Sequence, residues 1–240
     1  MELPQLLERF KLLSRDIQNG FQSMQKQLEN PTIDNQKIKD SLANTKEAWD
    51  DFSGWILIST LDNIHEARMN SVPGKLDLTS KVVRSKKRKQ TSLTSKSLKI
   101  DITNVDSIII ETYISYFEQL LDLLIDNAIK YSPVGGTIEI YTTALKNENG
   151  TILTVESIGP SIQKYEASQL GNKGFRGENA KKINIGGQGY GLFNCKKIAE
   201  LLGAEIKFNP NYKILNHVNN VQYSSFIVSI HLPSDPPSVN

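Results

Sequence analysis

Apolar side chains recur every three or four residues through the first part of the chain. Such spacing places them along one face of a helix. A second stripe runs from Ile38 to about Met69, and the helix-breaking segment Asn30-Pro31 separates the two stripes. The pattern predicts two long amphipathic helices that form an antiparallel hairpin over residues 1–75. The first stripe consists of Leu6, Phe10, Leu13, Ile17, Phe21, Met24 and Leu28.

The apolar faces of this hairpin carry the aromatic side chains of Phe21, Trp49 and Phe52. Two helices alone cannot enclose a core of this width. We therefore expect the hairpin to pair with a second copy of itself and form a dimeric four-helix bundle. The alternative is that the hairpin packs on the rest of its own chain.

From residue 98 onward the pattern changes to short alternating runs, which are typical of half-buried strands. Two helical segments interrupt these runs, and Ser132-Pro133 ends the first of them. Helices interleaved with hairpin-like strands favour an α+β sandwich over residues 76–240. The expected strands cover 98–102, 107–110, 137–144, 151–156 and 225–230, and the expected helices cover 113–131 and 191–202.

The composition supports a packed core and narrows the function classes. Of the 240 residues, 38% are hydrophobic and 22% are charged, and the formal net charge is +2. A charge so close to zero argues against nucleic-acid binding through overall charge. Cys195 is the only cysteine, which excludes an intrachain disulfide and fits a reducing, cytoplasmic compartment. No apolar run is long enough to span a membrane, and the start of the chain lacks the apolar segment of a signal peptide.

A basic run, Arg84-Ser-Lys-Lys-Arg-Lys89, lies in a polar stretch before the expected sandwich. Such a run is usually a solvated helix face or loop, and a contact with nucleic acid or lipid headgroups is the alternative. No aromatic side chain is interleaved with it, which argues against binding of a single strand.

Glycines cluster directly before the helix expected at 191–202, in the segment Gly186-Gly-Gln-Gly-Tyr-Gly-Leu192. Glycine lets backbone N–H groups approach phosphate oxygens, and a helix N-terminus adds partial positive charge. The cluster therefore predicts a phosphate-binding loop, with a plain flexible loop as the alternative. It is not a Walker A loop, because no Gly-Lys-Ser/Thr follows, and no strand leads into it as in a dinucleotide fingerprint.

A second candidate segment is Asp126-Asn-Ala-Ile-Lys-Tyr131 in the helix expected at 113–131. Helical spacing places Asn127, Lys130 and Tyr131 on one face. An amide oxygen can ligate Mg²⁺, an ammonium can meet a phosphate, and an aromatic ring can stack on a base. The segment predicts a nucleotide site, and an ordinary amphipathic helix is the alternative.

Together these segments resemble the catalytic core of sensor histidine kinases and the wider Bergerat-fold ATPases, over roughly residues 76–233. The helical hairpin resembles, more loosely, the dimerisation and phosphoacceptor domain of that family. The resemblance implies a helical hairpin at 1–75 followed by a Bergerat-fold ATP-binding domain at 76–240. Segment 117–136 resembles the N box, Gly159-Pro160 the G1 box, 174–177 the F box and 187–192 the G2 box.

The resemblance also implies a site for ATP and Mg²⁺. In that site Asn127 holds Mg²⁺, Lys130 and Arg176 meet the phosphates, and Tyr131 lies against the adenine. A glycine-rich lid closes over the phosphates. The remaining positions implied to contact nucleotide are Ser157, Gly159, Gly187, Gln188, Gly189, Gly191 and Leu192.

Two departures from the family concern this pocket. The family's G1 box reads Asp-x-Gly-x-Gly, and its Asp accepts a hydrogen bond from the adenine amino group. Here Ser157 replaces the Asp and Ser161 replaces the last glycine. A charge-assisted hydrogen bond is worth ~1.5–3 kcal/mol, so we expect weak or absent ATP binding. Leu123 also replaces an Asn that the family usually carries four residues before the Mg²⁺ ligand.

A third departure concerns the phosphoacceptor. The family's helix reads Ser-His-Glu-Leu-Arg-Thr-Pro-Leu, and the best match here is Ser14-Arg-Asp-Ile-Gln-Asn-Gly-Phe21, with Arg15 in place of the histidine. A guanidinium stays protonated and has no free lone pair, so it cannot attack a phosphorus atom as a neutral imidazole can. His65 is a less suitable candidate, because it lies too close to the N box.

The leading hypothesis is therefore a degenerate histidine kinase, or pseudokinase, in a two-component-type pathway. It would not phosphorylate itself and would act by docking a response-regulator receiver domain, a sensor or a partner kinase. One alternative is an active kinase or ATPase with an unorthodox G1 box, in which His65 or a partner's histidine accepts phosphate. The others are a phosphotransfer protein and an anti-sigma-like binder.

Overall fold

The computed structural model describes residues 3–29, 34–102, 107–145, 150–183 and 189–237. The chain forms two compact units, Met1–Asp62 and Asn63–Asn240. The hairpin domain was expected to reach residue 75, whereas residues 63–75 group with the second unit. Asn63 begins a new helix there, α3 (Ile64–Met69), and its side chain accepts a hydrogen bond from the Glu66 N–H at 3.2 Å. Arg68 in α3 donates to the carbonyl oxygens of Glu200 and Leu201 at 2.6 and 2.8 Å, which ties this segment to the second unit.

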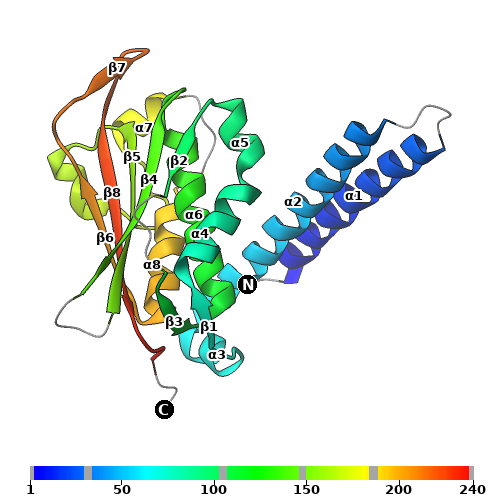
Figure 1. Cartoon of the computed structure of the whole chain (residues 1–240), viewed down its shortest axis with the longest axis horizontal. Helices are drawn as coiled ribbons and strands as arrows, with labels where there is room; N and C mark the ends of the chain where they lie inside the picture. Colours follow the sequence, from blue (N-terminus) through cyan, green and yellow to red (C-terminus); the bar gives the residue numbers. More distant parts are fainter. Residues whose placement is uncertain (1–2, 30–33, 103–106, 146–149, 184–188, 238–240) are drawn as a thin grey trace. The chain divides into compact units, whose positions relative to one another are not determined.

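The first unit is the expected antiparallel hairpin (Figure 1). It consists of α1 (Leu3–Leu28), α2 (Asn35–Ser59) and the 3-10 turn η1 (Thr60–Asp62). The Asp34 side chain starts α2 by accepting hydrogen bonds from the N–H groups of Gln36 and Lys37, at 3.0 and 3.1 Å. The two helices approach closely at Gly20, where any side chain would collide with the Thr45 hydroxyl.

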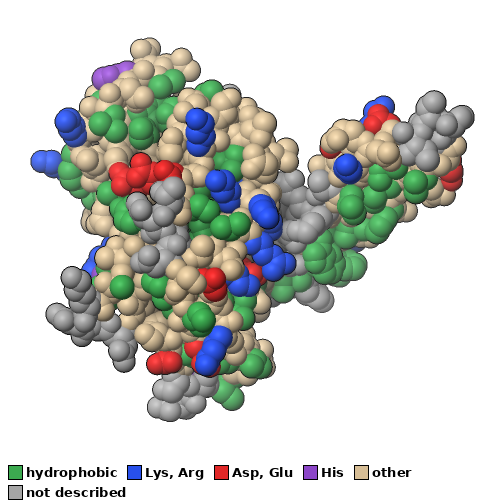
Figure 2. Space-filling view, viewed as in Figure 1, with side chains coloured by type: hydrophobic (Ala, Val, Ile, Leu, Met, Phe, Trp, Pro, Cys, Tyr) green, Lys and Arg blue, Asp and Glu red, His purple; other side chains and the backbone are tan. Residues whose placement is uncertain are grey.

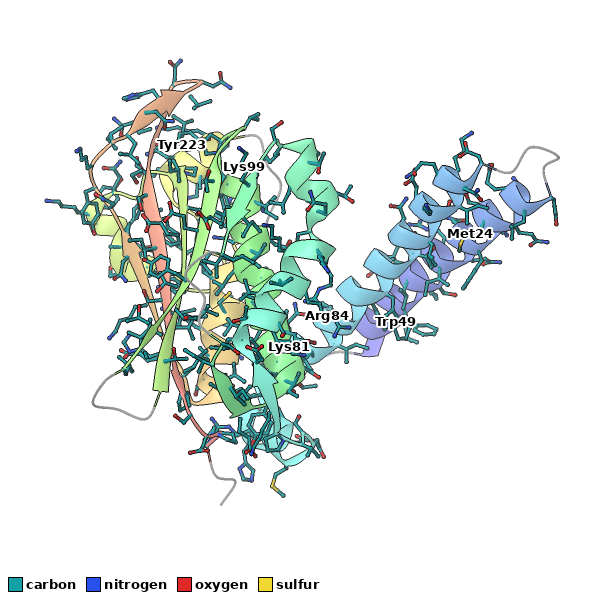
Figure 3. The ribbon with its side chains drawn as sticks, viewed as in Figure 1. Met24, Trp49, Lys81, Arg84, Lys99 and Tyr223 are labelled. Carbon is teal, nitrogen blue, oxygen red and sulfur yellow. The ribbon has the colours of Figure 1, made fainter. Side chains whose placement is uncertain are left out.

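Much of the apolar surface of the hairpin is not covered within this unit. Figure 2 shows hydrophobic side chains gathered along the hairpin, and Figure 3 places Trp49 on it. The side chains of Phe10, Phe21 and Trp49 are 56%, 60% and 54% exposed. These three line one groove together with Leu13 and Ile17. An apolar face of this kind marks a surface that a partner can cover.

The second unit is built on a mixed sheet with the strand order β2-β4-β5-β8-β6, and β7 pairs with β8. β2 runs parallel to β4, and the other neighbours are antiparallel. A separate two-stranded sheet pairs β1 (Gly74–Asp77) with β3 (Ile109–Thr112). The strands of the large sheet are β2 (Lys99–Asp101), β4 (Thr137–Ala144), β5 (Gly150–Pro160), β6 (Glu205–Pro210), β7 (Asn216–Val218) and β8 (Val221–Pro233).

Three helices cover one face of this sheet: α4 (Leu78–Arg88), α6 (Ile114–Tyr131) and α8 (Gly191–Leu202) (Figure 1). Phe117, Leu120 and Ile125 of α6 are fully buried, as are Ile140 and Leu153 of the sheet. A helix layer on one sheet is the expected α+β sandwich of the Bergerat type. The shorter helices are α5 (Gln90–Ser95), η2 (Lys164–Gln169) and α7 (Glu178–Lys182).

The basic run is not simply a solvated face. It belongs to the end of α4, where the Arg88 guanidinium contacts both carboxylate oxygens of Asp122 at 2.9 Å. The next residue, Lys89, pairs with Asp126 at 2.8 Å. Asp122 and Asp126 lie one helical turn apart on α6, so α6 presents a row of acidic groups to the basic end of α4. Arg84, labelled in Figure 3, stays exposed.

Candidate functional site

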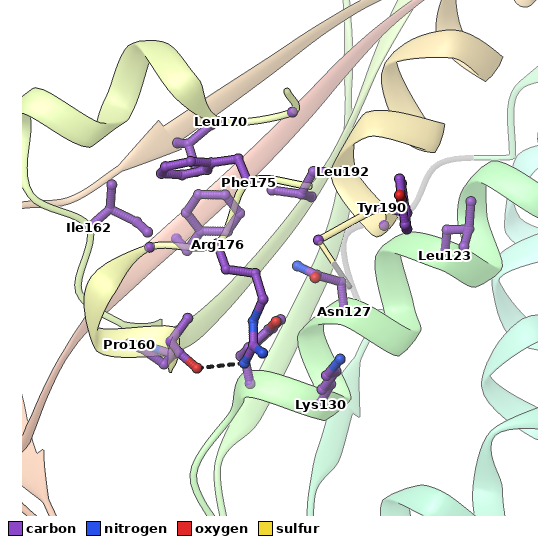
Figure 4. Close-up of a pocket in the computed structure, with 18 of the residues that line it drawn as sticks. Leu123, Asn127, Lys130, Pro160, Ile162, Leu170, Phe175, Arg176, Tyr190 and Leu192 are labelled. Atoms are coloured by element: carbon purple, nitrogen blue, oxygen red, sulfur yellow. Dashed lines mark hydrogen bonds between the residues drawn. The ribbon is translucent and has the colours of Figure 1, made fainter. Parts of the chain in front are cut away.

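A pocket of about 370 Å³ opens in the second unit (Figure 4). Its walls come from the C-terminal half of α6, the end of β5, the segment between Ile162 and Ala180, and the start of α8. Of the residues implied to contact nucleotide, those that line this pocket are Asn127, Lys130, Tyr131, Ser157, Gly159, Arg176, Gly189, Gly191 and Leu192. Gly187 and Gln188 lie outside the described residues.

Helix α6 contributes one face to the pocket, because Leu123, Asn127, Lys130 and Tyr131 follow one another at helical spacing. Asn127 points from α6 into the pocket (Figure 4). The Lys130 ammonium lies 5.3 Å from the centroid of the Tyr131 ring. Burial lowers the pKa of Lys130, and the nearby positive charge of Arg176 lowers it further. Two cations held close together in a partly buried site favour an anion between or beside them.

The start of α8 forms a second wall. Tyr190, the residue before the helix, provides no side-chain hydrogen bond to cap it. Gly191 follows, and a Cβ atom at that position would stand 3.9 Å from the Asn127 amide oxygen. The first N–H groups of a helix carry partial positive charge and bind anionic groups. This helix start, Asn127 and the two cations therefore build an anion-binding end of the pocket.

Gly189, the described residue of the glycine-rich segment before Tyr190, contacts the segment before α7. The Gly174 N–H donates to the Gly189 carbonyl oxygen at 3.2 Å. Gly189 has φ +76°, and a Cβ atom there would lie 2.6 Å from the carbonyl carbon of Gly174. No side chain fits this backbone-to-backbone contact, so the position requires glycine.

Arg176 reaches along the pocket from the Phe175 side toward the end of α6 (Figure 4). Its guanidinium donates to the Ala180 carbonyl oxygen in α7 at 2.7 Å. The same helix is held by the buried Glu166 carboxylate, which accepts hydrogen bonds from the N–H groups of Gln163 and Glu178 at 2.8 and 2.7 Å. The wall that carries Arg176 is thus fixed by buried polar contacts.

The opposite end of the pocket is apolar. Ile162, Leu170 and Phe175 lie together there (Figure 4). Ser157 lines the pocket and is 8% exposed. Its neighbour Glu156 is not among the lining residues and accepts a hydrogen bond from the Ser225 hydroxyl at 2.6 Å. This agrees with the alternation of side chains along a strand, which turns Glu156 to the other face.

Among the described residues that line the pocket, Asp126 is the only carboxylate, and Lys89 pairs with it. Groups of three or more His, Cys, Asp or Glu side chains that could hold a metal are absent from the described residues. Mg²⁺ typically binds through one or two protein oxygens, substrate phosphates and water. The Asn127 amide oxygen beside an anion-binding end fits that arrangement, whereas the apolar Leu123 offers no ligand.

Sequence reasoning missed Phe226, which also lines the pocket. It lies in β8 directly opposite Ser157 in β5. Its ring stacks on that of Phe208 in β6, with centroids 6.4 Å apart and an interplanar angle of 12°. The closing strand was expected at 225–230, but one strand pattern does not tell which strand pairs with it, and the pairing alone places Phe226 at the site.

Neither candidate acceptor residue is among those that line the pocket. Arg15 is exposed on α1 in the first unit, and its guanidinium contacts the Asp16 carboxylate at 3.2 Å. His65 is exposed on α3 and is not among the residues that line the pocket.

Comparison with known proteins identifies the class. Residues 113–236 match the family described as "Histidine kinase-, DNA gyrase B-, and HSP90-like ATPase". The match covers just over half of the chain, and the chain belongs to this family. The resemblance to a sensor histidine kinase catalytic core is confirmed.

Two of the relatives are histidine kinases. The chain is 31% identical to the sensor histidine kinase WalK of Bacillus subtilis over 88 residues, which are 37% of this chain and 14% of WalK. It is 28% identical to the histidine protein kinase SaeS of Staphylococcus aureus over 102 residues, which are 42% of this chain and 29% of SaeS. The matches thus span less than a third of these relatives' length.

Solved structures support the fold. The Acinetobacter baumannii histidine kinase AdeS superposes with a TM-score of 0.57 at 19% identity, and the match covers 94% of this chain and 96% of AdeS. Full-length ShkA in complex with AMPPNP gives a TM-score of 0.58 at 13% identity, over 99% of this chain and 47% of ShkA.

None of the helices in the described part of the chain is long and apolar enough to cross a membrane.

Proposed function

We propose that this chain is a degenerate histidine kinase core that serves as a regulatory module in a two-component-type pathway. In this proposal it binds nucleotide weakly, does not phosphorylate itself and acts by docking a receiver domain, a sensor or a partner kinase. The observation that carries the proposal is that the two ends of the pocket differ in the groups they offer to a ligand. One end keeps cations and a helix start, and the other has Ser157 where the family has a carboxylate.

The anion-binding end is suited to the phosphates of ATP. Lys130 and Arg176 are close enough for the charge of Arg176 to lower the pKa of Lys130. An anion placed at this end relieves that repulsion, and the amides of the α8 start add hydrogen-bond donors. Asn127 is placed to offer its amide oxygen to a Mg²⁺ ion carried by the phosphates. These contacts do not distinguish one base from another.

The base end lacks the contact that selects adenine in the family. A serine hydroxyl can accept only a neutral hydrogen bond, whereas a carboxylate forms a charge-assisted one worth ~1.5–3 kcal/mol. Complete loss of such a bond corresponds to an affinity about 10–100-fold weaker, and a neutral hydrogen bond to the serine recovers part of this loss. ATP binding in the range of tens of micromolar to millimolar is therefore expected.

The loss of autophosphorylation is inferred from Arg15. An exposed guanidinium paired with Asp16 provides no nucleophilic nitrogen. Without a phosphoryl group to pass on, the chain would act by binding. The uncovered apolar groove around Phe21 and Trp49 supports a homodimer through the first unit as the scaffold for such binding.

An active kinase or ATPase is the second candidate, because the pocket retains Asn127, Lys130 and Arg176. The test is incubation of the full chain with Mg²⁺ and ATP labelled at the γ-phosphate, followed by counting of protein-bound label and released phosphate. We expect neither. Acid-labile, base-stable label that disappears in His65→Ala would contradict the proposal and support the active kinase. Phosphate release that disappears in Asn127→Ala would support an ATPase.

A further inference from the structure

Phe226 faces Ser157 across the β5–β8 pair, and both side chains line the pocket. Directly opposed residues on antiparallel strands project to the same side of the sheet and form one surface. The base end of the pocket thus has a floor made of a hydroxyl and a phenyl ring. Only the hydroxyl can hydrogen-bond, and it can both donate and accept.

The Phe226 ring packs against a second ring on the same face of the sheet. Phe208 in the neighbouring strand β6 stacks on it nearly in parallel, and Lys196 lies 5.7 Å from the Phe208 centroid. Phe208 itself does not line the pocket. A ring held in this way offers a fixed flat surface, and aromatic rings stack on every base because every base has a π-face.

The surroundings of this floor provide no charged group that reads a base edge. Ile162, Leu170, Phe175 and Leu192 at this end are apolar, and Tyr131, which the family resemblance places against the base, is aromatic with a neutral hydroxyl. A hydrogen bond to a particular exocyclic group gives strong discrimination between bases, whereas apolar and stacking contacts give little. Base selectivity therefore depends on Ser157 and on the shape of the floor.

We propose that the Phe226 ring stacks on the base of a bound nucleotide, and that this contact makes the pocket a receptor for nucleoside triphosphates irrespective of the base. The ring contributes binding energy through stacking, and the phosphates contribute the rest through Lys130, Arg176 and the start of α8. This inference rests on the proposed function, because it assumes that the pocket binds nucleotide phosphates.

The test is calorimetric titration of the full chain with three ligands that carry the same phosphates: inorganic tripolyphosphate, ATP and GTP. We expect ATP and GTP to bind within about threefold of each other and each about tenfold or more tighter than tripolyphosphate. Phe226→Leu keeps an apolar side chain but removes the flat ring. In this variant ATP and GTP should weaken together, with tripolyphosphate unchanged.

Phe208→Leu is the matched control, because it removes the other ring of the same stack, which does not itself line the pocket. We expect it to affect ATP and GTP less than Phe226→Leu does. ATP bound at least tenfold tighter than GTP by the unmodified chain would overturn this inference while leaving the nucleotide pocket intact, and unchanged nucleotide affinity in Phe226→Leu would do the same. Failure of all three ligands to bind at millimolar concentration would overturn the proposed function and this inference with it.

Discussion

The Asn179 amide nitrogen donates two hydrogen bonds to Ser161, at 3.0 Å to the backbone oxygen and at 2.9 Å to the side-chain hydroxyl. Both residues are buried. The contact joins α7 to the turn that follows β5, at the base of the pocket wall that carries Arg176. In the sequence, Ser161 stands where the family has the last glycine of its G1 box. In the fold, its hydroxyl satisfies a buried amide.

Removal of the Ser161 hydroxyl should therefore destabilise the chain. We expect Ser161→Ala to lower the free energy of unfolding by ~1–2 kcal/mol, because one of the two bonds from a buried donor is lost. Urea unfolding of the full chain measures this, and Ser168→Ala, an exposed serine nearby, is the control with little expected effect. If Ser161→Ala is as stable as the unmodified chain, water replaces the hydroxyl and the contact does not fix the wall.

A second prediction concerns Lys96. Its ammonium donates to the carbonyl oxygens of Ile129, Lys130 and Ser132 at 2.8, 2.8 and 3.1 Å, and so caps the C-terminal end of α6. We expect Lys96→Met to cost about 1–3 kcal/mol of stability, since charged donors to helix-end carbonyls are among the stronger hydrogen bonds. Binding of tripolyphosphate should also weaken, because the same turn positions Lys130.

Lys99→Met is the control for Lys96, because Lys99 is an exposed lysine on the neighbouring β2. Thermal unfolding of both variants measures the loss of stability, and calorimetric titration measures the loss of tripolyphosphate affinity. Equal melting temperatures for Lys96→Met and Lys99→Met would show that the cap contributes nothing measurable.

The pH dependence of anion binding follows from Lys130. Burial and Arg176 lower its pKa below the ordinary value of 10.5, so it loses its proton at a lower pH than a solvated lysine. An anion binds the protonated form better, and affinity for tripolyphosphate should fall as the pH rises through the depressed pKa. The stability of the free protein should change with pH in the opposite direction. The charged ammonium lowers the free energy of unfolding below the depressed pKa, and this cost disappears as the pH rises toward 10.5.

Lys130→Arg separates this effect from the ionisation of the ligand, because a guanidinium keeps its charge throughout. Titrations between about pH 7 and 10 should show a steeper loss of affinity in the unmodified chain than in Lys130→Arg. Parallel pH profiles would mean that Lys130 does not contact the anion.

The sequence predicts the parts of this fold whose pattern is local. The periodicity of α6 and α8 and the alternation along β4 identify these elements almost to the residue, because each buries one face against the core. Asn127, Lys130 and Tyr131 could be grouped in advance because one helix carries all three. The strand β6 was missed although Ile206 and Phe208 alternate with polar neighbours, and the short α5 was missed because its six residues are too few for a periodic pattern.

Contacts between distant segments could not be predicted. The pairing of Arg88 with Asp122 depends on the packing of α4 against α6, which no local pattern fixes. Phe226 enters the pocket only because β8 pairs with β5 in a register that sets it opposite Ser157. The motif residues of a site are thus accessible from sequence, whereas the apolar residues that shape it depend on the tertiary fold.

The exposed groove of the hairpin predicts a homodimer. Burial of an aromatic side chain such as Phe21 or Trp49 contributes ~1.5–3 kcal/mol, so a glutamate at either position should disfavour association strongly. Light scattering at tens of micromolar should give a dimer for the full chain and a monomer for Phe21→Glu and Trp49→Glu. Asn35→Glu, at an exposed polar position of α2 outside the groove, is the control that should stay dimeric. A monomeric unmodified chain would refute this prediction.

Restoring a carboxylate at position 157 should restore selection of adenine. In Ser157→Asp the new carboxylate can accept a hydrogen bond from the adenine amino group, whereas guanine presents a carbonyl oxygen in the corresponding place, which cannot donate one. We expect ATP to bind up to ~10–100-fold tighter than to the unmodified chain, with GTP nearly unchanged. Because Ser157 is buried, burial should raise the pKa of the introduced carboxyl, and the gain should grow as the pH rises and the group ionises.

Ser157→Asn is the matched control. The asparagine side chain has the same shape as aspartate but carries no charge, and it can donate as well as accept hydrogen bonds. It should tighten ATP less and lose the difference between ATP and GTP. Titration of both nucleotides into all three proteins decides the point. Tight, ATP-selective binding by the unmodified chain would refute the degenerate interpretation of this pocket. If none of the three proteins binds nucleotide, the carboxylate is not the missing element, and Leu123 beside the Mg²⁺ position becomes the next residue to change.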